Sequence, residues 1–190
     1  MDRIDLRCVL DEKDVIIEAS SPSSLCAAEV GGNFLQAISD LSLRELFRMI
    51  IARVRETGQS MIFSLRCDTA ELKRLSYVRV GLHQTAAGSR VEVVNGTLQE
   101  TKHRIRLTLL DDEVPRGPEI LMICSWCKQV KLAGGRWVEV EEAMQELQLF
   151  EQRVLPRLSH GMCPTCAEAV RADMLRQVAA SGTPRSRAGA

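Results

Sequence analysis

Two Cys-x-x-Cys pairs decide how the last third of the chain folds: Cys124-Ser125-Trp126-Cys127 and Cys163-Pro164-Thr165-Cys166. Two residues between thiols allow both sulfurs of a pair to point at one ion from a tight turn. Two such pairs supply four thiolates, which suits a closed tetrahedral zinc site. We therefore predict one structural zinc ion, held by Cys124, Cys127, Cys163 and Cys166.

The chain around the two pairs predicts a small zinc-binding module. Residues 128–132 and 136–140, joined by a turn at 133–135, indicate a short hairpin, and residues 141–150 indicate a helix. Residues 167–178 indicate a final helix, and Pro164 suits its first position because the missing amide hydrogen would be unpaired there. The amides and dipole of that helix favour thiolate over thiol at Cys163 and Cys166. This layout is typical of a treble-clef-like zinc fold.

Other interpretations of the cysteines remain open. The four thiols could carry no metal, the first pair could be a thioredoxin-type redox pair, or the set could hold an iron–sulfur cluster. His160, three residues before Cys163, could replace one cysteine as a ligand or donate to a sulfur. Four cysteine ligands leave no open coordination position, so we expect no catalytic zinc.

The N-terminal part of the chain predicts a separate α+β unit. Residues 3–10 alternate between apolar and polar side chains, and residues 15–17 begin a second strand. Further strands are expected in residues 61–67, 77–82 and 91–93, and residues 104–110 could be another strand or a linker. The apolar stripe over residues 42–57 predicts a helix. Ser42 and Glu45 suggest a capping box at its start, and Gly58 its end.

Composition narrows the class of protein. The 190 residues include 25 basic and 25 acidic side chains, a balance that argues against a dedicated nucleic-acid or anionic-membrane surface. No apolar run approaches the roughly 20 residues that span a bilayer. The charged N-terminus does not resemble a secretory signal. We therefore expect a cytoplasmic protein with reduced thiols, and Cys8 and Cys67 as core residues.

Residues 3–96 resemble a compact PAS domain. The resemblance rests on the opening hairpin, the Gly31-Gly32-Asn33-Phe34-Leu35-Gln36 stretch, the 42–57 helix with its Glu56-Thr57-Gly58 exit, Arg66-Cys67-Asp68 and the strand at 77–82. It implies a five-stranded antiparallel sheet flanked by helices, with sensing or dimerisation as its work. Light-sensing relatives carry a cysteine after the asparagine, whereas Phe34 follows Asn33 here. Haem-binding relatives use a helix histidine, which residues 42–57 lack, so we expect neither flavin nor haem.

Residues 120–176 resemble a cysteine-rich segment that follows sensory domains in bacterial signalling proteins. The matching features are Ile123-Cys124-Ser125-Trp126-Cys127-Lys128, then Gly135-Arg136-Trp137, then the run from Ser159 to Cys166. We accordingly expect a PAS-like domain at 1–112, a linker at 113–119, a zinc-binding module at 120–178 and a disordered tail at 179–190.

No sequence feature indicates an enzyme. The chain has no glycine-rich nucleotide loop and no triad at a known spacing. The leading hypothesis is a non-enzymatic signalling protein that dimerises through the PAS-like domain and docks a protein partner through the zinc module. A thiol-based redox or metal sensor and a nucleic-acid-binding zinc regulator are the alternatives, although the balanced charge gives no reason to expect nucleic acid.

Overall fold

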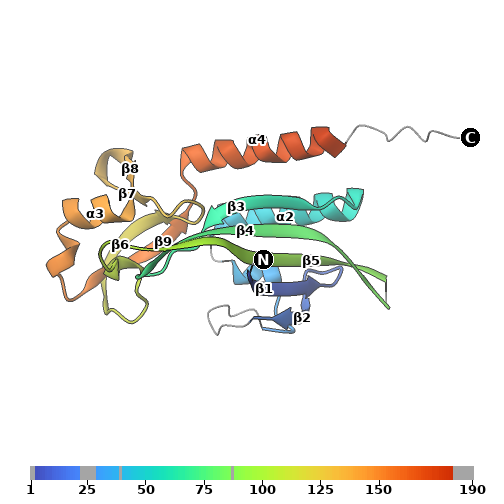
Figure 1. Cartoon of the computed structure of the whole chain (residues 1–190), viewed down its shortest axis with the longest axis horizontal. Coiled ribbons are helices and arrows are strands. Elements are labelled where there is room, and N and C mark those ends of the chain that lie inside the picture. The colour runs from blue at the N-terminus through green and yellow to red at the C-terminus, as the bar shows by residue number, and fades with distance from the viewer. Residues whose placement is uncertain (1–2, 22–28, 39, 87, 182–190) are drawn as a thin grey trace, which may run out of the picture.

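The computed structural model describes residues 3–21, 29–38, 40–86 and 88–181, which form two sheets with helices (Figure 1). The first sheet contains β1 (Arg3–Leu10), β2 (Ile16–Ser20), β3 (Met61–Arg66), β4 (Leu72–Thr85) and β5 (Gly88–Lys102). Its order is β2-β1-β5-β4-β3, and every neighbouring pair is antiparallel. This confirms the five-stranded antiparallel sheet with flanking helices.

Helix α2 (Leu41–Thr57) covers one face of this sheet, after the short α1 (Phe34–Ala37). Its apolar stripe is buried, as the periodicity predicts, through Leu46, Phe47, Ile50, Ile51 and Val54. Gly58 ends the helix in the left-handed conformation, with φ 72°, as predicted. The predicted capping box is wrong, because Asp40 is the N-cap and accepts a hydrogen bond from the Leu43 amide.

The second sheet has the order β8-β7-β6-β9. It consists of β6 (Arg116–Cys124), β7 (Val130–Lys131), β8 (Trp137–Val138) and β9 (Leu155–Gly161), with α3 (Val140–Glu146) between β8 and β9. Strands β7 and β8 form the predicted hairpin, whereas β6 and β9 pair in parallel. Helix α4 (Pro164–Ser181) follows and runs beside the first sheet (Figure 1).

The segment between the sheets is more ordered than the sequence suggests. Residues 104–110 are not a strand but a loop with a short 3-10 helix at Thr108–Leu110, which buries Leu107 and Leu109 completely. Residues 116–119, expected in the linker, belong to β6. Helix α4 extends to Ser181, beyond the predicted end at 178, and residues 182–190 lie outside the described part of the chain.

The core does not divide at the expected boundary. One apolar cluster joins α2 and the first sheet to Cys124, Trp126, Cys163 and Val170 from the cysteine-rich region. A second apolar cluster packs on the second sheet and includes Leu107 and Leu109. Its other members include Ile123, Val138, Met144 and Leu155. Cys8 is fully buried as predicted, whereas Cys67 is only half-buried.

Candidate metal centre

The four predicted cysteines meet at one edge of the second sheet. Cys124 is the last residue of β6, and it lies opposite Gly161, the last residue of β9. Because parallel strands end at the same edge of a sheet, this pairing brings the first Cys-x-x-Cys beside the start of α4, which carries the second. The four Sγ atoms all lie within 4.8 Å of one another.

The spacing of the sulfurs suits a tetrahedral ion. A zinc ion with Zn–S bonds of about 2.3 Å separates its sulfurs by about 3.8 Å. The Sγ atoms of Cys127 and Cys163, which belong to different pairs, lie 3.8 Å apart. The Cys163 amide donates to the Cys124 sulfur and the Cys166 amide to the Cys163 sulfur, each at 3.4 Å. The donor set therefore fits a thiolate-bound metal ion.

A tight turn, here called the knuckle (residues 124–129), holds the first pair. The Lys128 amide donates to the Cys124 carbonyl at 3.0 Å, and the Cys124 amide donates to the Gln129 carbonyl at 2.7 Å. Lys128 adopts the left-handed conformation, with φ 66°, to close this turn. Cys124 and Cys163 are buried, and Cys127 and Cys166 are half-buried.

The pKa values of Cys124, Cys127 and Cys166 are shifted in different directions. A hydrogen bond from Cys127, helped by the Cys163 amide, lowers the pKa of Cys124 to about 4. The same hydrogen bond raises the pKa of Cys127 well above its usual value, and burial raises the pKa of Cys166 to about 12. Neighbouring thiols thus oppose full ionisation by themselves, and a divalent cation would supply the charge that stabilises four thiolates together.

His160 does not join the sulfurs. It lies in β9, and the group of side chains with potential ligand atoms close enough to share an ion contains only the four cysteines among the described residues. Desolvation lowers the pKa of His160, and the charge of Lys128 lowers it further, against the opposite influence of Asp40 and Asp112. The interpretation of His160 as an alternative ligand therefore finds no support in the geometry.

The knuckle packs directly on the first sheet. The Trp126 ring is buried and meets Phe63 of β3 edge-to-face, with ring centroids 6.0 Å apart. The Arg66 amide donates to the Trp126 carbonyl at 2.8 Å, which extends the backbone pairing of β3 onto the knuckle. The Ser125 hydroxyl bonds to the buried Asp40 carboxylate at 3.3 Å. The sequence shows none of these contacts, because each joins residues far apart in the chain.

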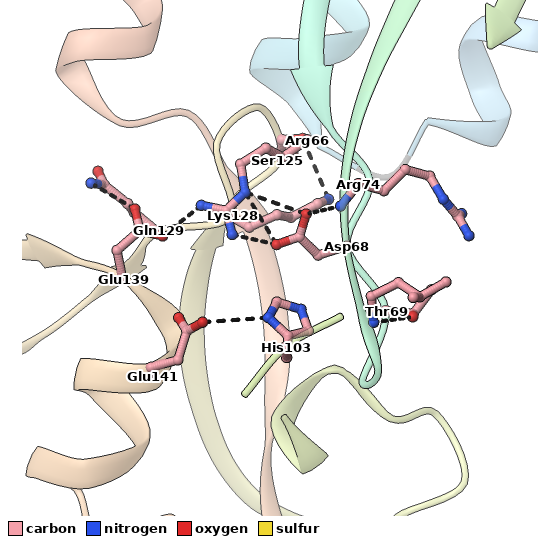
Figure 2. Close-up of polar contacts among 11 residues, drawn as sticks. Arg66, Asp68, Thr69, Arg74, His103, Ser125, Lys128, Gln129, Glu139 and Glu141 are labelled. Atoms are coloured by element: carbon pink, nitrogen blue, oxygen red, sulfur yellow. Dashed lines mark hydrogen bonds and ion pairs between the residues drawn. The ribbon is translucent and has the colours of Figure 1, made fainter. Parts of the chain in front are cut away.

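Polar contacts join the ends of β3 and β5 to the start of α3 next to the knuckle (Figure 2). The Arg66 guanidinium ion-pairs with Asp68, whose carboxylate is fully buried, and with Glu139 at 2.5 Å. His103 is also buried, and its Nδ1 atom lies 3.4 Å from a Glu141 oxygen. The sequence gives no local indication of this buried contact between His103 and Glu141.

Comparisons with known proteins add little to this geometry. No protein-family model matches the chain, and no curated protein matches it. A sensory box sensor histidine kinase from Vibrio cholerae is similar at 12% identity and a TM-score of 0.39, over 50% of this chain and 82% of that one. At this TM-score the similarity supports no argument about fold or function.

The fold and the cysteine cluster define a structural class for this chain, although no family model matches it. The chain is an α+β protein in which a five-stranded antiparallel sheet packs against four clustered cysteines that could hold a metal ion. None of the helices in the described part of the chain is long and apolar enough to cross a bilayer.

Proposed function

We propose that this chain is a non-enzymatic bacterial signalling protein, with a PAS-like sensing or dimerisation domain and one structural zinc ion. The observation that carries the proposal is the convergence of four thiols from two chain segments beside a five-stranded sheet. Four thiolates close the coordination shell, so the metal would stabilise the fold rather than activate water. The second sheet, with its knuckle and hairpin, would form a treble-clef-like surface for a protein partner.

The first test is elemental analysis of the purified chain together with its absorbance spectrum. We expect about one zinc per chain and a spectrum without visible bands. Iron with visible charge-transfer absorbance would instead indicate an iron–sulfur cluster. A metal-free chain that stays folded, with a melting temperature unchanged by added zinc, would contradict a structural zinc role.

The signalling role needs its own test, because a zinc site alone does not imply it. Light scattering on the full chain should give the mass of a dimer, and affinity capture from the native cytosol should recover a defined protein partner. A protein that is monomeric at all concentrations and recovers no partner would argue against the signalling role, while leaving the metal site unaffected.

A thiol-based redox or metal sensor is the second candidate. The contacts of Ser125 with the start of α2 and of Trp126 with β3 favour it, because opening the knuckle would disturb both elements directly. Mild peroxide should then release zinc and change the oligomeric state. If zinc is retained and the oligomeric mass does not change, the sensor role is excluded and only the structural role of zinc remains.

A further inference from the structure

A polar pocket separate from the sulfurs lies on the second sheet. Its volume is about 420 Å³, within the usual range of small-ligand sites. Three basic side chains line it: Arg116 at the start of β6, Lys128 of the knuckle and Arg157 in β9. The apolar side chains of Leu110, Ile123 and Leu158 complete the wall, beside His160.

These three cations lack the carboxylate partners that most arginines of this chain have. Arg7 and Arg79, for example, share Glu92 on the first sheet. No ion pair joins Arg116, Lys128 or Arg157 to a carboxylate within the described residues, and their bonds go to backbone carbonyls. A carbonyl satisfies an N–H group but leaves the positive charge in place.

The acids at the pocket do not cancel this charge. Asp68 is already held by Arg66, and its carboxylate is fully buried. Asp112 is the other acid in the lining, and it is exposed. The lining thus holds three basic side chains and two carboxylates, one of which is paired with Arg66, so the pocket carries excess positive charge.

Arg116 and Arg157 also have N–H donors that the hydrogen bonds described above do not use. A guanidinium has five N–H groups. Arg116 uses its Nη atoms on three carbonyls, those of Leu109, Asp111 and Pro156, and Arg157 uses one Nη atom on the Pro118 carbonyl. The remaining N–H groups are available to a planar or tetrahedral oxyanion, which arginine binds well.

We propose that this pocket binds a small organic anion, with a carboxylate or phosphate headgroup on a short apolar body. The headgroup would meet Arg157, Arg116 and Lys128, and the apolar body would lie on Leu110, Ile123 and Leu158. A zinc-bound tetrathiolate would carry negative charge that offsets Lys128 in part. Arg116 and Arg157 lie further along β6 and β9 from Cys124, so their charge remains for the ligand.

The test is calorimetric titration of the full chain with phenyl phosphate, phenylacetate and the neutral benzyl alcohol. We expect one or both anions to bind and raise the melting temperature, and the alcohol to do neither. Preference between the two anions distinguishes phosphate from carboxylate. Amide NMR shifts should move at Lys128 and Leu158, which locates the ligand in this pocket.

Arg157→Gln should weaken anion binding by about tenfold, which is typical of losing one charge-assisted contact. Arg153→Gln, an exposed arginine outside the pocket lining, is the matched control and should change affinity less than about twofold. Zinc content and circular dichroism of both variants report folding. Failure of both anions to bind at about 10 mM, or unchanged affinity in Arg157→Gln, would overturn the proposal.

Discussion

At the residue scale, the chemistry of the candidate site depends on where each sulfur lies. Cys124 and Cys163 are buried in the core that includes Trp126, whereas Cys127 and Cys166 are half-buried at its margin. A metal ion would therefore link an enclosed half of the site to a more accessible half. Substitution of a half-buried cysteine therefore tests metal binding with the least disturbance of core packing.

Cys127→Ser should lower the zinc content from about one ion per chain to near zero, because a hydroxyl is a far weaker ligand than a thiolate. The melting temperature should fall with it. Cys67→Ser is the control, since Cys67 is also half-buried but lies outside the cluster. Equal zinc content in the two variants, measured by elemental analysis, would show that Cys127 is not a ligand.

A second residue-scale prediction concerns Glu92, whose carboxylate is shared by Arg7 and Arg79 at 2.7 Å each. Burial by itself would raise the pKa of Glu92, but the two arginine hydrogen bonds outweigh it and hold the pKa below its usual value. A lowered carboxylate pKa stabilises the fold above the unfolded-state pKa, and this contribution disappears as the pH falls through the folded-state pKa.

Glu92→Gln should therefore cost about 1–2 kcal/mol of unfolding free energy at pH 7 and less at about pH 3. Urea unfolding at the two pH values measures this difference. Glu18→Gln, which removes an exposed partner of Arg7, should have little effect at either pH. A penalty for Glu92→Gln that does not change with pH would show that the charge contributes nothing.

At the element scale, the start of α2 connects the first sheet to the knuckle. Asp40 accepts the Leu43 amide as N-cap, and its other carboxylate oxygen meets the Ser125 hydroxyl. The two partners use different oxygens, so the carboxylate can hold both at once. From the sequence alone, Ser42 with Glu45 is as plausible an N-cap as Asp40. In the structure Asp40 is the cap, and it also contacts the knuckle.

Asp40→Ala should destabilise the protein by about 1–2 kcal/mol, since it removes a helix cap and a buried hydrogen bond. Ser42→Ala should cost almost nothing if the cap lies where the structure has it. Chemical unfolding of the two variants decides between the caps. A larger loss for Ser42→Ala would restore the capping box that the sequence suggests.

At the scale of the whole molecule, the cysteine-rich region is not an independent appendage. Its Trp126 lies in the same apolar cluster as α2 and the first sheet, and Arg66 at the end of β3 pairs with Glu139 at the start of α3. An ion that holds the knuckle would therefore stabilise the first sheet as well. The chain should unfold as one cooperative unit while the metal is bound.

Metal removal tests this coupling in a Trp137→Phe variant, where Trp126 is the remaining tryptophan. A strong chelator should shift its emission to longer wavelength, as Trp126 leaves its contact with Phe63, and should lower the melting temperature of the first sheet by several degrees. Added zinc should reverse both effects. Loss of the tryptophan signal without any change in sheet stability would show that the two parts are uncoupled.

Local sequence patterns predict much of the secondary structure. Period-two alternation predicts β1 as a strand, although burial in β1 increases toward Leu10 instead of alternating. The apolar stripe places α2 and its buried face. The two Cys-x-x-Cys pairs indicate the candidate metal centre, since their spacing is a property of the local turn. The cysteine and apolar patterns thus determined which residues could form the site.

The tertiary structure alone decided how these parts meet. The parallel pairing of β6 with β9 brings the two cysteine pairs together. The contact of Trp126 with Phe63 and the burial of the His103 side chain have no local signal. The same holds for the hydrogen bond that Asp40 accepts from Ser125, 85 residues away, whereas its cap contact with Leu43 is local. Short-range patterns reflect the energetics of one element, whereas contacts between distant segments exist only once the chain has packed.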